Sequence, residues 1–222
     1  GMVEATTRGS YRLGPQAAAL AEDIAHWRSA EQRVCDWDGA WLVVSTGGLS
    51  RSDRVALRAR ERALALSGFR LLGSHLYLRP DNLVGHAAAA RDRLYKLGLD
   101  SNAPVFSVRD LDPERERLAR TLWQGDKLNA SYRQGRIKLQ AWIEHADQLD
   151  LDVAARESFL LGNDAIRQLV YDPLLPEPLV DVRERRAFTD MVRHYDQVGR
   201  DIWRRQLAQL SQQPAMPVAL TP

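Results

Sequence analysis

Two pairs of aspartates are the residues of this sequence whose type and spacing could support metal chemistry. Asp36 and Asp38 stand two positions apart, as do Asp110 and Asp112, and carboxylate oxygens can bind a divalent cation. Aspartates beside a turn glycine such as Gly39, however, commonly hydrogen-bond the neighbouring backbone. Asp112 also suits the N-terminal cap of a helix. We therefore predict structural roles for both pairs and no metal site.

Cys35 is the single cysteine, which excludes a disulfide within the chain and a cysteine-based zinc site. No neighbouring residue suggests a base, so we interpret Cys35 as a half-buried, small hydrophobic residue. The sequence contains no phosphate-binding loop, no H-E-x-x-H pattern and no G-x-S-x-G motif. We predict no catalytic residues, and the absence of a catalytic constellation favours binding or regulation over catalysis.

The basic residues are almost all arginines, because only three of the 31 lysines and arginines are lysines. Arg51, Arg54, Arg58, Arg60 and Arg62 concentrate in or beside one predicted helix, and guanidinium groups can bind the phosphates of nucleic acids or cofactors. A solvated helix face with intrahelical Glu–Arg pairs is the interpretation we favour. The formal net charge of +2 also creates no strong global attraction to nucleic acid or anionic membranes.

Length and composition indicate a globular protein with one large domain or two small ones. The chain has 222 residues, of which 45% are hydrophobic and 27% are charged. No apolar run approaches the ~20 residues that cross a membrane. No N-terminal stretch resembles a signal peptide. We expect a cytoplasmic protein without membrane contact.

The first half of the sequence predicts an α+β fold. Strand–helix–hairpin–helix–strand order is typical of ferredoxin-like domains. Along the second hairpin strand, Leu76 and Leu78 alternate with more polar residues, which predicts one solvent-exposed face. The predicted strands are 8–13, 40–46, 69–72, 75–79 and 105–109, and the predicted helices are 15–33, 52–67 and 82–98.

The second half, from Asp112 onward, shows only helical patterns. Helices are predicted over 126–149, 153–171 and 182–210, and a proline-rich loop over 172–178 separates the last two. Apolar residues from Phe188 to Ile202 recur at helical spacing. We expect four segments: an N-terminal part (1–36), a ferredoxin-like domain (37–111), an all-helical C-terminal domain (112–211) and a flexible tail (212–222).

Four short stretches together resemble the PaaX family of bacterial transcriptional regulators, typified by the repressor of phenylacetic acid catabolism. They are Y-R-L-G-P at 11–15, W-D-G-A-W at 37–41, R-x-x-L-R at 54–58 followed by G-F at 68–69, and Y-D-P-L-L-P at 171–176. Each stretch is weakly specific by itself. The order and spacing of the four stretches together are more specific, and the resemblance covers nearly the whole chain. The motif residues to which we assign structural roles are Trp37, Gly39, Trp41, Arg58, Gly68, Phe69, Asp172, Pro173 and Pro176.

The resemblance implies a DNA-binding winged helix, a middle domain similar to the small nuclease subunit of CRISPR adaptation, and a helical C-terminal domain. It also implies a homodimer that an aryl-CoA thioester releases from DNA. Residues 11–13 correspond to the end of the wing, so we expect most of the winged helix to be absent, with Arg8 and Arg12 near the DNA backbone. The family tryptophan after the D-P-x-L-P motif is replaced here by Glu184.

A CoA thioester carries phosphates at one end and an apolar acyl group at the other, so its site needs arginines and aromatic residues. The candidate ligand residues are Trp123, Tyr132, Arg133, Arg136, Trp142 and Arg167. Core packing remains an alternative for each aromatic residue.

The sequence therefore predicts the effector-binding and dimerisation portion of a non-enzymatic repressor that needs no cofactor. Two alternatives stay open: a metal-dependent nucleic-acid-processing enzyme, and an interaction partner of a full-length regulator. The predicted first strand of the nuclease-like domain ends in Ser45 and Thr46, without the aspartate found in the nuclease, which argues against the enzyme.

Overall fold

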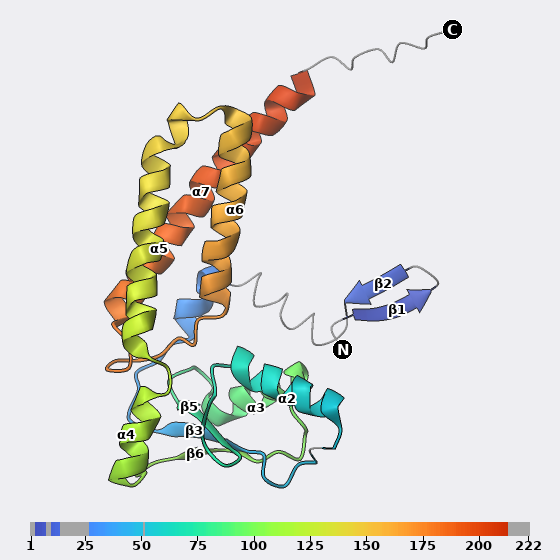
Figure 1. Ribbon diagram of the computed structural model, residues 1–222, viewed down its shortest axis with the longest axis vertical. Helices are drawn as coiled ribbons and strands as arrows, with labels where there is room; N and C mark the ends of the chain where they lie inside the picture. Colours follow the sequence, from blue (N-terminus) through green and yellow to red (C-terminus); the bar gives the residue numbers. More distant parts are fainter. Residues whose placement is uncertain (1–2, 8–9, 14–26, 51, 213–222) are drawn as a thin grey trace.

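A small antiparallel sheet with its helices and a bundle of long helices are the two main parts of the structure (Figure 1). The computed structural model describes residues 3–7, 10–13, 27–50 and 52–212. The N-terminal elements are β1 (Val3–Thr7), β2 (Ser10–Leu13) and the short 3₁₀ helix η1 (Trp27–Arg33). The strands β1 and β2 pair as an antiparallel hairpin. Of the helix predicted over 15–33, residues 14–26 lie outside the described residues, and 27–33 form η1 rather than an α-helix.

The α+β part follows the predicted order of elements. It consists of β3 (Trp41–Ser45), α2 (Arg54–Leu66), β4 (Arg70–Gly73), β5 (Leu76–Pro80), α3 (His86–Leu97) and β6 (Val105–Val108). The strands are ordered β4-β5-β3-β6, and every neighbouring pair is antiparallel. The chain is thus a mixed α+β protein with a four-stranded sheet and a helical C-terminal region.

Both faces of this sheet are covered. Leu42 and Val44 of β3 pack on one face with buried residues of α2 and α3. Trp41 and Val43 point to the other face, where α4 (Pro113–Thr121) and the loop after the long helix α6 (Leu151–Val170) cover them. Trp123 stacks on Trp41 with ring centroids 6.0 Å apart. The sheet therefore lies between its own helices and the C-terminal part of the chain.

The prediction that β5 has one solvent-exposed face is wrong. Leu78 is 1% exposed and Arg79 is 5% exposed, and Tyr77 packs against the helix-covered core. Only Leu76, at 40%, is exposed. Alternation along the strand indicated which side chains share a face, but the polar face is covered by the core of α2 and α3, where Arg79 also donates to the carbonyls of Ser67 and Pro173. Leu78 is consequently unavailable for contact with a second copy of the chain.

Three local predictions also need correction. The helix α3 begins at His86 instead of at residue 82, and Asn82 is a fully buried connector. The hairpin turn lies at Ser74 and His75, one residue later than predicted, with His75 at a positive φ of 67°. On α2, the apolar spacing places Val55 on the buried stripe and Arg60 on the solvated face, but Val55 is 79% exposed and Arg60 is 3% exposed.

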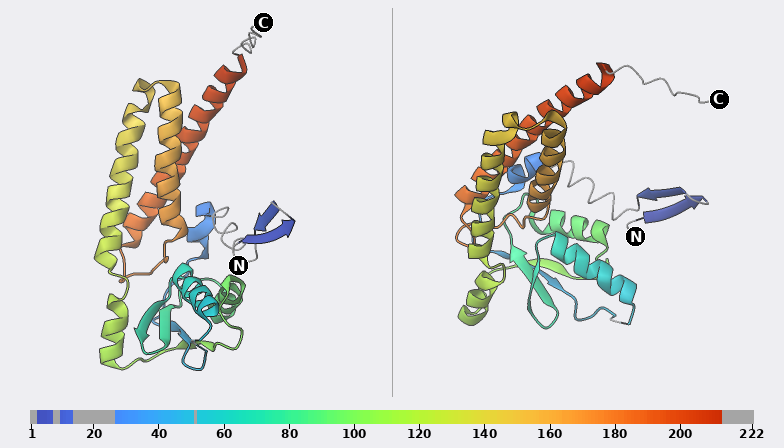
Figure 2. Two further views of the ribbon diagram at one scale, coloured as in Figure 1. Left: turned by 45° about the vertical axis from the view of Figure 1, so that its right-hand side comes forward. Right: turned by 45° about the horizontal axis from the view of Figure 1, so that its top comes forward.

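The helical part is a bundle of α5 (Gly125–His145), α6 and α7 (Val182–Gln212), and the 3₁₀ helix η2 (Ala146–Gln148) follows α5 directly (Figure 2). The apolar stripe of α7 packs inside this bundle: Phe188, Tyr195 and Ile202 are each at most 1% exposed. This stripe therefore serves the core of its own domain and is not free to form a dimer surface. The C-terminal end of α7 projects beyond α5 and α6 (Figure 1).

Candidate ligand-binding site

The loop between α6 and α7 is held by buried side chains of the α+β part. Arg79 Nη2 donates a hydrogen bond to the Pro173 carbonyl at 3.3 Å, and Asn82 Nδ2 donates to the Leu174 carbonyl at 2.7 Å. Arg79 Nη2 also contacts Asn82 Oδ1 at 3.1 Å. Prolines remove backbone donors from this loop, so its carbonyls need donors from elsewhere. The side chains of β5 and of the β5–α3 connector supply them.

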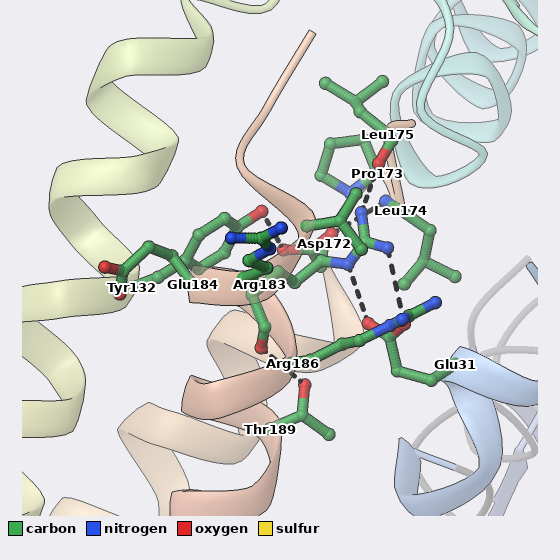
Figure 3. A network of polar contacts seen from close by, with 12 residues as sticks. Glu31, Tyr132, Asp172, Pro173, Leu174, Leu175, Arg183, Glu184, Arg186 and Thr189 are labelled. Carbon is green, nitrogen blue, oxygen red and sulfur yellow. Dashed lines mark hydrogen bonds and ion pairs between the residues drawn. The ribbon is translucent and has the colours of Figure 1, made fainter. Parts of the chain in front are cut away.

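The same loop is held on its other side by the helical part. Arg185 is 0% exposed, and it donates to the Leu175 carbonyl and, from Nε at 2.7 Å, to Oε1 of Glu31. Tyr132 of α5 donates to Asp172 Oδ2 at 2.6 Å. Figure 3 shows Tyr132 directed at Asp172 across the loop, and Glu31 approaching from η1. Donors from both parts of the chain thus fix three consecutive loop carbonyls.

Burial raises the pKa values of two side chains that hold the loop, Asp172 and Tyr132. Burial raises the pKa of Asp172 above its ordinary value, although the hydrogen bond from Tyr132 and the charge of Arg185 act in the opposite direction. Burial and the nearby Asp172 carboxylate raise the pKa of Tyr132, which therefore remains a proton donor at neutral pH. Glu31 keeps Arg185 charged and raises its pKa despite the burial of the guanidinium.

Arg79 lies in a positively charged environment. Burial, followed by the charges of Arg93 and Arg33, lowers its pKa to about 10. Its Nη1 donates to the Ser67 carbonyl at 2.8 Å. At neutral pH Arg79 remains charged. The guanidinium groups of Arg79, Arg93 and Arg33 therefore place positive charge on this side of the loop.

A cavity of about 530 Å³ lies where α3, η1 and the loop meet. Its apolar wall includes Leu42, Leu66, Phe69 and Leu169. Ala89 and Ala90 of α3 also line the cavity, and their small side chains leave room there. The charged lining residues are Arg33, Arg79, Arg93, Lys96, Asp92 and Asp172, with His86 beside them. An apolar chamber of this size with convergent charged groups is typical of a small-molecule site.

The six predicted ligand residues do not form one site. Tyr132 and Arg167 line a smaller recess of about 390 Å³ beside Asp172. Arg133 is exposed on α5, and Arg136 pairs with Glu184 at 3.1 Å.

The two tryptophans of that set have structural partners. Trp142 Nε1 donates to Glu157 at 2.9 Å, and Trp123 Nε1 donates to the Gly68 carbonyl at 2.9 Å. Of the predicted DNA contacts, Arg8 lies outside the described residues, and Arg12 belongs to β2, of which the structure describes the backbone.

Several residues of the four stretches meet at the junction of the two parts. Gly68 has a positive φ of 75°, and a Cβ there would lie 3.2 Å from Pro173, so a side chain would be both strained and crowded. Phe69 is buried beside it. Pro176 O accepts a hydrogen bond from Leu179 N at 2.9 Å. Arg58, by contrast, is exposed on α2.

The first aspartate-rich turn behaves as predicted from its residue types. Gly39 has a φ of 91°, Asp38 accepts a hydrogen bond from Ala40 N at 3.1 Å, and Trp37 Nε1 donates to the Ala40 carbonyl at 2.6 Å. Asp38 also pairs with Arg109. Asp112 caps α4 by accepting from Arg115 N at 3.0 Å. Among the described residues, no three potential metal ligands cluster.

No pattern in the sequence singled out Arg79, Asn82 or Arg185. For Arg185 a signal was available, because it stands three residues before Phe188 on the apolar stripe of α7. A charged residue on such a stripe must find a buried partner. Arg79 and Asn82 carry no comparable signal.

Comparison with known proteins identifies the class of the helical part. Residues 123–205, from Trp123 through most of α7, match the family model of the PaaX-like protein C-terminal domain. The match is confined to this region, so the helical part of the chain is similar to a PaaX-like C-terminal domain.

A solved structure supports the fold over most of the chain. The uncharacterized protein Rv0674 from Mycobacterium tuberculosis superposes with a TM-score of 0.53 at 19% sequence identity, covering 91% of this chain and 79% of that one. This likeness concerns the fold alone. A search of curated proteins finds no match. No helix within the described ranges is long and apolar enough to cross a membrane.

Proposed function

We propose that this chain is the effector-binding and dimerisation portion of a PaaX-type repressor of aromatic-acid catabolism that responds to an aryl-CoA-like ligand. The observation that carries the proposal is the family match over residues 123–205. A cytoplasmic, non-enzymatic homodimer accords with such a regulator.

The proposal includes a division of the chain into four segments. Residues 37–111 form a ferredoxin-like domain, supported by the strand order β4-β5-β3-β6 and by the packing of α2 and α3 on one sheet face. Residues 112–211 form the helical domain, and 212–222 form a tail. Within 1–36, the hairpin of β1 and β2 corresponds to the wing, where Arg8 and Arg12 would meet the DNA backbone.

Binding of an aryl-CoA is tested by calorimetric titration of the purified chain with phenylacetyl-CoA. The expected result is saturable binding of phenylacetyl-CoA and none of phenylacetate alone. Of the predicted residues, Tyr132 and Arg167 share a recess, so Arg167→Ala should weaken binding and the exposed Arg133→Ala should weaken it less. Equal binding by wild type and by the double variant Arg133→Ala with Arg167→Ala would exclude these residues, and no binding at all would exclude the aryl-CoA effector.

Assembly is tested on the same preparation by light scattering. A mass of twice 25.1 kDa at micromolar concentration is expected. A monomer over the whole concentration range would contradict the dimerisation role.

A further inference from the structure

The helix α2 presents a row of arginines on its outer face. Arg54, Arg58 and Arg62 stand four residues apart, so their side chains share one face of the helix. All three are exposed, whereas Arg60 of the same helix is buried and bonds Asp100 Oδ2 at 2.9 Å. Helical geometry places the three about 6 Å apart along the axis, over a span of about 12 Å. These three residues form the α2 arginine row.

The α2 arginine row differs from the exposed arginines of the other helices. Those arginines pair with carboxylates three or four positions away, as in Arg115–Asp112, Arg120–Glu116, Arg193–Asp190, Arg200–Asp196 and Arg204–Asp201. Within the described part of the chain, no ion pair or side-chain hydrogen bond involves a guanidinium group of the row. The intrahelical Glu–Arg pairs that we favoured from the sequence therefore do not form on this face.

Two carboxylates stand near the row and do not neutralise it. Asp53 caps α2, since its Oδ1 accepts hydrogen bonds from Val55 N at 2.8 Å and from Ala56 N at 3.1 Å. Glu61 is exposed on α2, and it forms no ion pair with any described residue. The three arginines outnumber these two acids. Like charges four residues apart also destabilise a helix, so a bound anion would offset the repulsion along the row.

The shape of the row favours a linear polyanion as its partner. Duplex DNA carries one phosphate per about 3.4 Å of axis on each strand, so a row of about 12 Å spans three or four phosphates. Guanidinium groups bind phosphate oxygens through two parallel hydrogen bonds. A membrane surface fits less well, because a helix that binds membranes inserts an apolar face. The buried apolar residues of α2, Ala63 and Leu64, pack in the core of the α+β part.

We propose that the α2 arginine row binds the phosphate backbone of double-stranded DNA without reading its sequence. This inference rests on the proposed function, because a repressor acts on DNA, and it adds a contact surface outside the β1–β2 hairpin. Phosphate contacts fix the position of a protein on the duplex but carry no sequence information. The helix α2 covers the sheet face opposite to α4, so DNA at the row would leave the α4 side uncovered (Figure 1).

The experiment measures the fluorescence anisotropy of a labelled duplex of random sequence, titrated with the whole chain from about 50 to about 200 mM salt. The wild type should bind, and its affinity should fall as salt rises. The triple variant Arg54→Gln, Arg58→Gln and Arg62→Gln should weaken binding at low salt by about tenfold or more. The slope of log affinity against log salt should become shallower by about 2–3, because each phosphate contact contributes about 0.9.

The matched control is the triple variant Arg156→Gln, Arg183→Gln and Arg205→Gln. It removes the same charge from exposed positions of the helical part, so it should change the affinity and the slope far less. Circular dichroism should show that both variants are folded, because glutamine is a good helix former and all six positions are exposed. Polyglutamate and vesicles of anionic and neutral phospholipid are the competing partners in the same titration.

The outcomes separate this inference from the proposed function. No binding of DNA by the wild type at low salt, or an equal loss in the two triple variants, would overturn the role of the row. Binding of polyglutamate or of vesicles as tightly as of DNA would overturn the assignment of DNA as the partner. Binding of DNA through the row, together with failure to bind phenylacetyl-CoA, would support this inference and count against the proposed effector.

Discussion

At the scale of single residues, Arg185 shows how this protein accommodates a charge in its core. Its side chain is 0% exposed, yet it donates to Glu31 and to the Leu175 carbonyl. A buried ion pair adds little stability compared with apolar residues packed in its place. Removing one partner, however, leaves the other charge buried without compensation. The neighbouring Arg186 approaches the same Glu31 at 3.7 Å with a side chain that is 64% exposed. The two arginines therefore share one partner, Glu31, and differ in their burial.

Arg185→Met should lower the free energy of unfolding by about 3–5 kcal/mol, because it leaves Glu31 and the Leu175 carbonyl without their donor. Urea unfolding followed by circular dichroism measures the change. The matched control, Arg186→Met, removes an exposed contact and should cost less than about 1 kcal/mol. Similar losses in the two variants would contradict the importance of burial.

Asp172 should make stability depend on pH in a direction opposite to that of most carboxylates. Burial raises its pKa in the folded protein, so the folded state binds this proton more tightly than the unfolded state does. The stabilising contribution is complete below the unfolded pKa of about 3.9 and is lost as pH rises through the raised folded pKa.

Asp172→Asn is neutral at every pH and removes this titration. The difference in unfolding free energy, wild type minus variant, should fall as pH rises from acid to neutral. Urea unfolding of both proteins across that range provides the measurement. A difference that stays constant or grows with pH would show that the folded pKa is not raised.

At the scale of elements, the close approach of α5 and α7 depends on a glycine. A Cβ at Gly135 would lie 2.6 Å from Phe188 Cε2, and the Phe188 ring is 0% exposed and stacks on Tyr132. The ring cannot move without disturbing the core of the bundle. Elsewhere in the bundle, a Cβ at Gly199 of α7 would lie 3.6 Å from Ser158 Cβ, which is ordinary contact.

Gly135→Ala should therefore destabilise the protein by about 1–3 kcal/mol through overpacking, although alanine favours helix more than glycine does. Gly199→Ala should be neutral or stabilise by up to about 1 kcal/mol, because the same gain in helix propensity meets no clash. Thermal unfolding of the two variants gives the comparison. A stabilised Gly135→Ala variant would show that α5 and α7 have room to separate.

At the scale of the whole molecule, the two parts are joined by specific buried contacts. Trp123 stacks on Trp41, and Trp41 Nε1 donates to Glu116 at 2.8 Å. Arg79 and Asn82 donate to the loop carbonyls from the other side of the junction. Such contacts couple the α+β part to the helical bundle, so we expect both to unfold together.

Far-UV circular dichroism and tryptophan fluorescence should thus report one coincident unfolding transition. Asn82→Ala should lower the free energy of unfolding by about 1–3 kcal/mol, because the Leu174 carbonyl and Arg79 each lose a buried partner. Asn102→Ala, at an exposed asparagine, is the control and should have little effect. Two separate transitions in the wild type would contradict the coupling.

Much of the fold was predictable because it depends on local patterns. Apolar runs and helical spacing predicted the four sheet strands and the helices α2, α5, α6 and α7, and glycines and prolines predicted the breaks between them. The cap of α4 at Asp112 was predictable for the same reason. These features rest on residues within a few positions of one another, so a single sequence contains the information.

The candidate site could not be predicted in this way. Tyr132 and Arg167 do share a recess, but the larger cavity depends on Ser67, Arg79 and Arg93, which none of the sequence patterns singled out. Periodicity shows which face of an element is apolar, and it does not show which polar face a distant loop will cover. The sequence alone determined the elements and the family resemblance. Only the tertiary structure decided that Arg79, Asn82 and Arg185 are buried, because their partners stand on segments up to 154 residues away in the chain.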